Sequence, residues 1–130
     1  MTRIFGRIET GQRVGAGFTR TDWALGVFQS VYGVDPFPGT LNVRVDAASV
    51  EAWQAAAIQG RLFKAPDPSW CDARCLRAKV IHQTHFAATV IVLPLVGSYP
   101  EDQIELVAGM NLRDWLEAKD GDSVALDLEF

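Results

Sequence analysis

The sequence predicts a mainly β fold, a small barrel with short helical insertions, and three observations support this prediction. About six segments alternate apolar and polar residues or are rich in β-branched residues, as strands are. Three segments have the apolar spacing of helices, and each of them is short. The strand segments do not alternate regularly with the helical ones, which argues against a doubly wound parallel sheet and favours a barrel.

The predicted strands run along the whole chain, and no repeat or linker separates them. They are Arg3–Glu9, Thr40–Arg44, Arg74–Ile81, Phe86–Leu93, Ile104–Ala108 and Ser123–Phe130. The strong turn signal Asp120-Gly121 precedes the last of them. We expect Gly60–Trp70 to be an irregular loop, because Pro66 and Pro68 lie in it.

Each predicted helix begins at a residue whose side chain can accept a hydrogen bond from free backbone N–H groups. Thr21 or Asp22 begins the first, which ends at Gly33, and its apolar face comprises Trp23, Val27, Phe28 and Val31. Asp46 begins the second, Ala47–Ile58, and Asn111 begins the third, Leu112–Ala118.

The composition predicts one globular domain, residues 1–130, with 48% hydrophobic and 22% charged residues. A net charge of −4 argues against non-specific nucleic-acid binding, which needs a broad basic surface. Neither a bilayer-spanning apolar run nor a signal peptide is visible, so we expect a cytoplasmic protein without a membrane partner. Cys71 and Cys75 are then expected to be reduced thiols. The oligomeric state, monomer or small homo-oligomer, stays open.

Residues 35–44, read D-P-F-P-G-T-L-N-V-R, are the most informative segment. Because strand side chains alternate between faces, Thr40, Asn42 and Arg44 share the face opposite the core. Gly39 beside them lets a ligand approach the backbone. Neutral oxygens suit Mg²⁺ when a bound polyphosphate supplies the negative charge. The alternative is an edge strand whose polar face is merely solvated.

A glycine-rich stretch, with Gly11, Gly15 and Gly17, lies between the first strand and the first helix. Such loops direct backbone N–H groups at phosphate oxygens, and the arginines of the first twenty residues favour a phosphorylated small molecule. The alternative is a plain turn, because the spacing matches neither the Walker nor the dinucleotide fingerprint.

The stretch 104–116, I-E-L-V-A-G-M-N-L-R-D-W-L, joins a strand to a helix. Glu105 lies between apolar neighbours and faces away from them, so it is either a rim residue or the single carboxylate of a cleft. The backbone of Gly109–Leu112 can offer free N–H groups to an acceptor, although helix capping by Asn111 explains the same residues.

A zinc site is a further alternative, built on Cys71, Cys75, His82 and His85. Tetrahedral sites usually have tighter cysteine spacing, and a strand would send the two histidines to opposite faces. A buried cysteine at a strand start and two partly exposed histidines are the simpler interpretation.

Together, the order of these segments resembles the archaeal-type CTP-dependent riboflavin kinases. The resemblance is carried by the glycine-rich loop, then P-F-P-G-T-L-N, I-E-L-V-A-x-M-N-L-R and K-D-G-D, and it covers nearly the whole chain. It implies a six-stranded cradle-loop (RIFT-type) β-barrel. It also implies a Mg²⁺-dependent enzyme that transfers the terminal phosphate of CTP to the 5′-hydroxyl of riboflavin, giving FMN and CDP.

The resemblance also implies roles for particular residues. Thr40 and Asn42 would bind Mg²⁺, and Glu105 would contact the flavin and could accept the hydroxyl proton. The nucleotide would be held by Gly11, Gly15, Ala16, Gly17 and Phe18 of the loop and by Met110, Asn111, Leu112 and Arg113.

Two departures from the family pattern lie on ligand-facing loops. Gln12, Arg13 and Val14 widen the glycine loop, and Ser98 takes the place of a threonine expected near the flavin. They motivate a second hypothesis, a non-catalytic nucleotide- or flavin-binding module on the same barrel.

Overall fold

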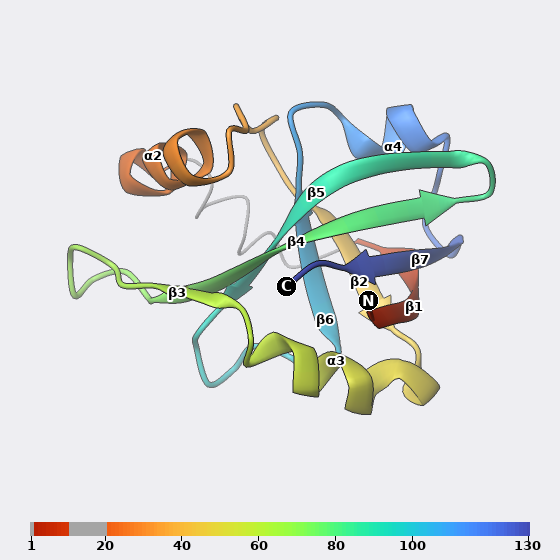
Figure 1. Ribbon diagram of the computed structural model, residues 1–130, viewed down its shortest axis with the longest axis horizontal. Helices are drawn as coiled ribbons and strands as arrows, with labels where there is room; N and C mark the ends of the chain where they lie inside the picture. The colour runs from red at the N-terminus through yellow and green to blue at the C-terminus, as the bar shows by residue number, and fades with distance from the viewer. Residues whose placement is uncertain (1, 11–20) are drawn as a thin grey trace.

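Six antiparallel strands close into a barrel in the computed structural model, which describes residues 2–10 and 21–130 (Figure 1). The strand order is β4-β5-β6-β2-β1-β7, and β7 pairs back with β4 to close the cylinder. The strands are β1 (Thr2–Glu9), β2 (Leu41–Val45), β4 (Ala73–His82), β5 (His85–Pro94), β6 (Gln103–Val107) and β7 (Ser123–Leu128). The prediction of a mainly β, six-stranded barrel is therefore confirmed.

A seventh, three-residue strand, β3 (Arg61–Phe63), pairs with the first part of β4. The second part of β4 pairs with β7 along the same edge, so one long strand serves two neighbours. The sequence predicted a loop over Gly60–Trp70, and this was wrong for the β3 residues. Three residues are too few to show the alternation by which a strand is recognised.

The inward-facing side chains of all six barrel strands form one core. Ile4 and Ile8 of β1 and Val43 of β2 are almost fully buried there. Gly6 lies between the two isoleucines and opposite Val45. A Cβ at Gly6 would lie 2.5 Å from the Arg44 carbonyl oxygen, so only glycine lets β1 and β2 approach this closely.

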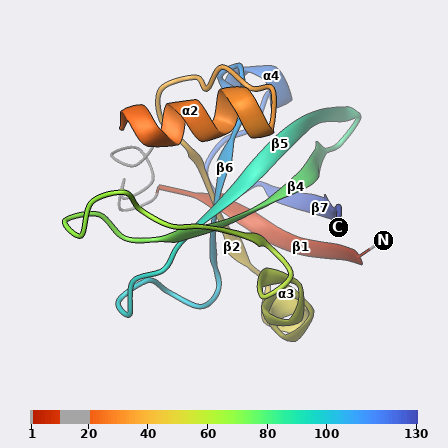
Figure 2. The ribbon, with the colours of Figure 1, turned by 60° about the vertical axis from the view of Figure 1, so that its left-hand side comes forward.

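Helices close the two ends of the barrel, with α3 (Val50–Ala57) at one end and α4 (Leu112–Leu116) at the other (Figures 1 and 2). Trp53 of α3 and Leu116 of α4 are both buried in the same core. Asp46 precedes a 3-10 turn, η1 (Ala47–Ser49), that leads into α3, and its side chain makes no capping hydrogen bond. The predicted second helix exists, but the aspartate does not cap it through its side chain.

A third helix, α2 (Asp22–Val31), covers the outer face of β4, β5 and β6 (Figure 2). Ala24 and Phe28 are fully buried against a second apolar cluster that includes Cys75, Val90, Val92 and Val107. The sequence predicted Val27 on the apolar face of this helix and did not predict Ala24 there. Only contact with the barrel decides which side of this short helix is buried, because apolar residues occur on several of its sides.

No helix within the described part of the chain is long and apolar enough to cross a membrane. The cytoplasmic location stays a prediction.

The two thiols are expected to differ strongly in reactivity. Cys75 is buried under α2, and this burial raises the pKa of its thiol to about 12, while Cys71 is partly exposed. Because the thiolate is the reactive form, Cys75 should react with a disulfide reagent at pH 8 only after unfolding. Titration with Ellman's reagent should find one fast thiol in the native protein and two in denaturant. Cys71→Ser is the control and should remove the fast thiol; two fast thiols in the native protein would contradict this burial.

Candidate functional site

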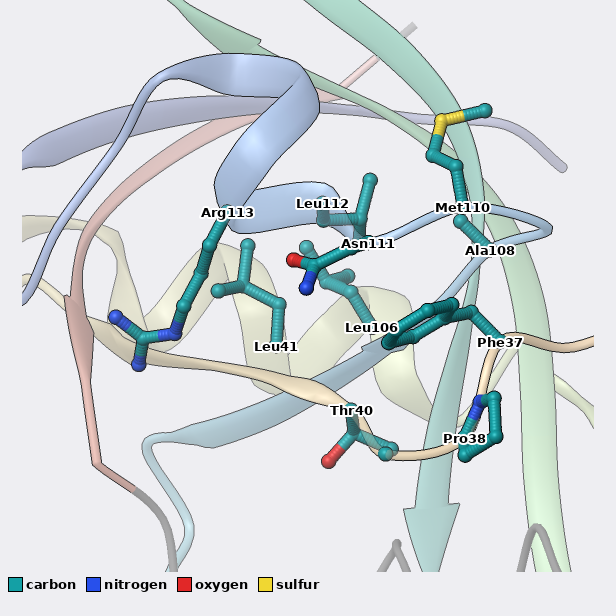
Figure 3. A pocket seen from close by; sticks show the side chains of 11 residues that line it. Phe37, Pro38, Thr40, Leu41, Leu106, Ala108, Met110, Asn111, Leu112 and Arg113 are labelled. Carbon is teal, nitrogen blue, oxygen red and sulfur yellow. The ribbon is translucent and has the colours of Figure 1, made fainter.

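A cavity of about 160 Å³ lies where the start of β2 meets the end of β6 (Figure 3). Two chain segments line it, and they face each other across the space. One contributes Phe37, Pro38, Gly39, Thr40 and Leu41, and the other contributes Ala108, Met110, Asn111, Leu112 and Arg113, with Leu106 between them. The structure therefore brings together Thr40 and all four residues predicted in 110–113.

The first wall is a turn tied to the barrel by its backbone. The Phe37 N–H donates to the Ala108 carbonyl oxygen at 2.8 Å, so the turn is anchored on the far end of β6. Gly39 has φ +99°, a conformation that other residues adopt only under strain. Among residues 2–10 and 21–130, no atom beyond the glycine and its chain neighbours lies within 4 Å of a Cβ built there, so the backbone angle is the reason for the glycine. The turn places Thr40 immediately before β2.

The second wall is the start of α4. The Asn111 side-chain oxygen accepts from the Asp114 N–H at 3.3 Å, which confirms the predicted helix cap. Leu112 and Leu116 are buried in the barrel core and hold the helix in place. Figure 3 shows the Asn111 amide directed into the space between the two walls.

Arg113 links this wall to the end of β1. Its guanidinium pairs with Asp120 at 2.7 Å, and the Thr10 hydroxyl donates to the same carboxylate at 2.7 Å. The hydrogen bond from Thr10, together with Arg113, holds the pKa of Asp120 below its usual range. A guanidinium therefore stands beside the point where the chain enters residues 11–20. The predicted loop contacts Gly11, Gly15, Ala16, Gly17 and Phe18 lie outside the described residues.

The polar face of β2 is covered, which differs from the expected open row. β2 lies between β1 and β6, so the alternative of a solvated edge strand is wrong. Thr40 borders the cavity, but only 6% of Asn42 is exposed. Asn42 lies opposite Glu105 in the sheet, and its amide oxygen accepts from the Gln103 side-chain amide at 3.2 Å. Side chains of β6 therefore reach across this face.

Glu105 is completely buried, so the alternative of a rim residue is wrong. The Tyr99 hydroxyl donates to one carboxylate oxygen at 2.8 Å, and the Thr40 hydroxyl contacts the other at 3.4 Å, near the limit for a hydrogen bond. Burial and the neighbouring carboxylate raise the pKa of Tyr99, so its hydroxyl stays a donor at neutral pH. Arg44, on the same face, pairs with Glu9 at 2.7 Å and with Asp102.

Ser98 is exposed on the connection between β5 and β6, next to Tyr99. The same connection lines a second cavity of about 310 Å³ together with α3. Leu95, Val96 and Ile58 contribute apolar side chains to its wall. Tyr99 reaches from this second cavity to Glu105, so it joins the two regions.

The zinc alternative is not supported, because its four residues do not converge. Cys75 and His82 are seven residues apart on β4, which corresponds to about 23 Å of extended chain. His82 was expected to be partly exposed but is buried, with Nδ1 2.8 Å from the Leu116 carbonyl oxygen and Nε2 3.3 Å from Asp122. Among residues 2–10 and 21–130, no group of three or more His, Cys, Asp or Glu side chains is placed to hold a metal ion.

A metal bound with a polyphosphate would need different ligands, and the residues present are compatible with one. Thr40 supplies a hydroxyl oxygen at the cavity edge, and the Asn42 amide oxygen keeps one lone pair beyond the bond from Gln103. Thr40 lies immediately before β2 and Asn42 is its second residue, and Mg²⁺ takes such neutral oxygens when phosphates complete its shell.

Sequence reasoning missed several residues of this region. Phe37, Leu106 and Ala108 line the cavity, although the sequence predicted the first as part of a turn and the others as part of a strand. Gln103 had no signal in the sequence, because its role depends on which strand lies beside β6. Only the pairing of β6 with β2 reveals it.

Known proteins match the chain over most of its length. The family model CTP-dep_RFKase, described as a domain of unknown function, DUF120, matches residues 8–128. A protein of Methanocella arvoryzae named riboflavin kinase is 32% identical over 125 residues, which are 95% of this chain and 56% of that protein. A protein of Methanoculleus marisnigri, also named riboflavin kinase, is 35% identical over 105 residues, which are 78% of this chain and 46% of that protein.

The chain thus spans about half the length of these first two relatives. A third relative of the same name, from Methanobrevibacter smithii, is 28% identical and matched over 98% of its own length and 96% of this chain. The similarity therefore covers nearly all of this chain.

The turn that carries Thr40 should depend on the backbone angle of Gly39. We expect Gly39→Ala to lower the free energy of unfolding by about 1 to 3 kcal/mol, because alanine is strained at φ +99°. Gly26→Ala is the matched control: Gly26 lies inside α2, and the described part of the chain leaves open space around a Cβ there, so alanine should stabilise by about 0.5 to 1 kcal/mol. Urea unfolding measures both; equal effects of the two substitutions would contradict the turn geometry.

Proposed function

Because this chain belongs to the CTP-dependent riboflavin kinase family, we propose that it transfers the terminal phosphate of CTP to the 5′-hydroxyl of riboflavin. The bond between the terminal phosphorus and the bridging oxygen of CDP breaks, and a bond from the riboflavin oxygen to that phosphorus forms. The products are FMN and CDP, and the hydroxyl proton passes to a base.

The observation that carries this proposal is the cavity between Thr40 and residues 110–113. Its two walls are far apart in the sequence, and each corresponds to a motif of the family resemblance. In the proposed complex, residues 110–113 hold the cytidine end of the nucleotide, and Thr40 lies at the phosphate end. Arg113 shares the Asp120 carboxylate with Thr10, which directly precedes residues 11–20, and the glycines of those residues are proposed to cover the phosphates.

Thr40 and Asn42 are the proposed ligands of Mg²⁺, as argued above from their oxygens. When bound, the ion would neutralise phosphate charge and align the terminal phosphate. Phosphoryl transfer needs little covalent help from protein, and positioning and charge neutralisation supply most of the rate. A site built from hydroxyl and amide oxygens, backbone donors and one guanidinium fits that requirement.

Glu105 is the proposed contact to the flavin alcohol and the candidate base. It is the buried carboxylate next to Thr40, 3.4 Å from its hydroxyl, and therefore lies beside the proposed phosphate end. Tyr99 donates to its other oxygen and keeps the carboxylate in place. Ser98, one residue before Tyr99, is the proposed second flavin contact.

Phosphorylation of riboflavin tests the proposal directly. Purified protein with riboflavin and Mg²⁺ should form FMN, fastest with CTP among the four common nucleoside triphosphates, and chelation of Mg²⁺ should stop the reaction. Chromatography with fluorescence detection separates FMN from riboflavin. Tight binding of CTP or riboflavin without any FMN would instead favour a non-catalytic binding module. Absence of both binding and FMN would reject both functions.

Removal of the Thr40 hydroxyl should impair turnover without loss of the fold. Thr40→Val keeps the shape of the side chain, and we expect kcat to fall at least about tenfold, or about 1.4 kcal/mol in activation free energy. Thr89→Val is the matched control, since Thr89 is buried on β5 and its hydroxyl donates to the Ala78 carbonyl oxygen at 2.8 Å. That variant should lose stability but keep kcat, whereas an unchanged kcat in Thr40→Val would contradict the assigned role.

A further inference from the structure

We propose that Gln103 is a positioning residue, which directs the Asn42 amide oxygen toward the bound metal–nucleotide complex. The inference rests on the proposed function, because it assigns a residue to the metal end of that same site. Gln103 begins β6 and is 2% exposed, an unusual burial for a glutamine. Its side-chain amide donates to the Asn42 amide oxygen at 3.2 Å.

The sheet register explains why these two residues meet. Gln103 lies directly opposite Arg44, and Glu105 lies directly opposite Asn42. Gln103 therefore reaches Asn42 along the diagonal, a distance that long side chains span on one face of a sheet. Glu105 repeats the diagonal pattern one step further along β6, since it contacts the Thr40 hydroxyl. Thus Asn42 on β2 and Thr40 just before it each contact one buried polar side chain of β6.

The Asn42 amide needs such a partner because its terminal torsion is broad. An asparagine amide has two nearly equivalent orientations, which exchange its oxygen and its nitrogen. In the structure the Gln103 amide donates, so the Asn42 oxygen lies on the Gln103 side, and its second lone pair is the proposed contact to the cation. Without that donor, an orientation that presents the NH₂ group becomes available, and an NH₂ group cannot bind a metal.

Binding of Mn²⁺ tests this role without any turnover. Electron paramagnetic resonance measures the affinity of Mn²⁺ for the full chain in the presence of CDP, and calorimetry measures CDP affinity in the presence of a chelator. Gln103→Met keeps the length of the side chain and removes the donor. We expect Mn²⁺ affinity to fall about tenfold, as is typical when a residue that orients a metal ligand is lost, with metal-free CDP affinity unchanged. The Mg²⁺ concentration for half-maximal FMN formation should rise in parallel, with a smaller change in kcat at saturating Mg²⁺.

A double-mutant cycle separates a positioning role from a structural one. If Gln103 acts through Asn42, Gln103→Met should have no further effect on Mn²⁺ affinity in the Asn42→Ala background. Gln54→Met is the matched control, because Gln54 is exposed on α3 and donates to Glu101 at 3.1 Å, and it should leave Mn²⁺ affinity unchanged.

Each remaining outcome overturns the inference. Equal Mn²⁺ affinity in native protein and Gln103→Met, additive losses in the cycle, or no Mn²⁺ bound with CDP by the native protein would each reject it. Formation of FMN by the native protein would leave the proposed function standing in all three cases. Conversely, normal Mn²⁺ and CDP results with no FMN would reject the kinase and keep the role of Gln103.

Discussion

The pairing of β2 with β6 is the constraint on which the rest of the site depends. It sets Leu41 opposite Leu106 and Asn42 opposite Glu105, so one side of the pair is core and the other is polar. A slip of one residue would send the apolar side chains outward and the polar ones into the barrel. The barrel core therefore holds the register, and the register decides which polar side chains meet.

The polar side of this pair is buried as well, and that shapes its chemistry. A fully buried carboxylate such as Glu105 is costly unless donors surround it, and Tyr99 and Thr40 supply contacts to both of its oxygens. The same contacts join the β5–β6 connection to the cavity wall. The same hydrogen bonds thus stabilise the fold and fix the geometry of the site. A substitution at Tyr99 would therefore affect Thr40 through the Glu105 carboxylate.

Barrel closure adds a second requirement, a close approach of β1 and β2 at Gly6. That approach brings the end of β1, with Glu9 and Thr10, next to Arg44 and to the Asp120 carboxylate. Arg44 pairs with Glu9 and Arg113 pairs with Asp120, and these ion pairs orient the two guanidinium groups. Thr10 is therefore held close to Arg113, which lines the cavity.

The sequence by itself determined the barrel strands, the short helices and the two segments that line the cavity, because alternation, caps and turn residues are local signals. Asn111 as a cap and the proline-bounded turn at Gly39 were both visible in this way. Only the tertiary structure decided that Thr40 and residues 110–113 border one cavity, that Asn42 and Glu105 are buried, and that Gln103 contacts Asn42. These facts depend on which strands become neighbours and in which register, and that choice is made by the closed barrel and its core and not by any local pattern.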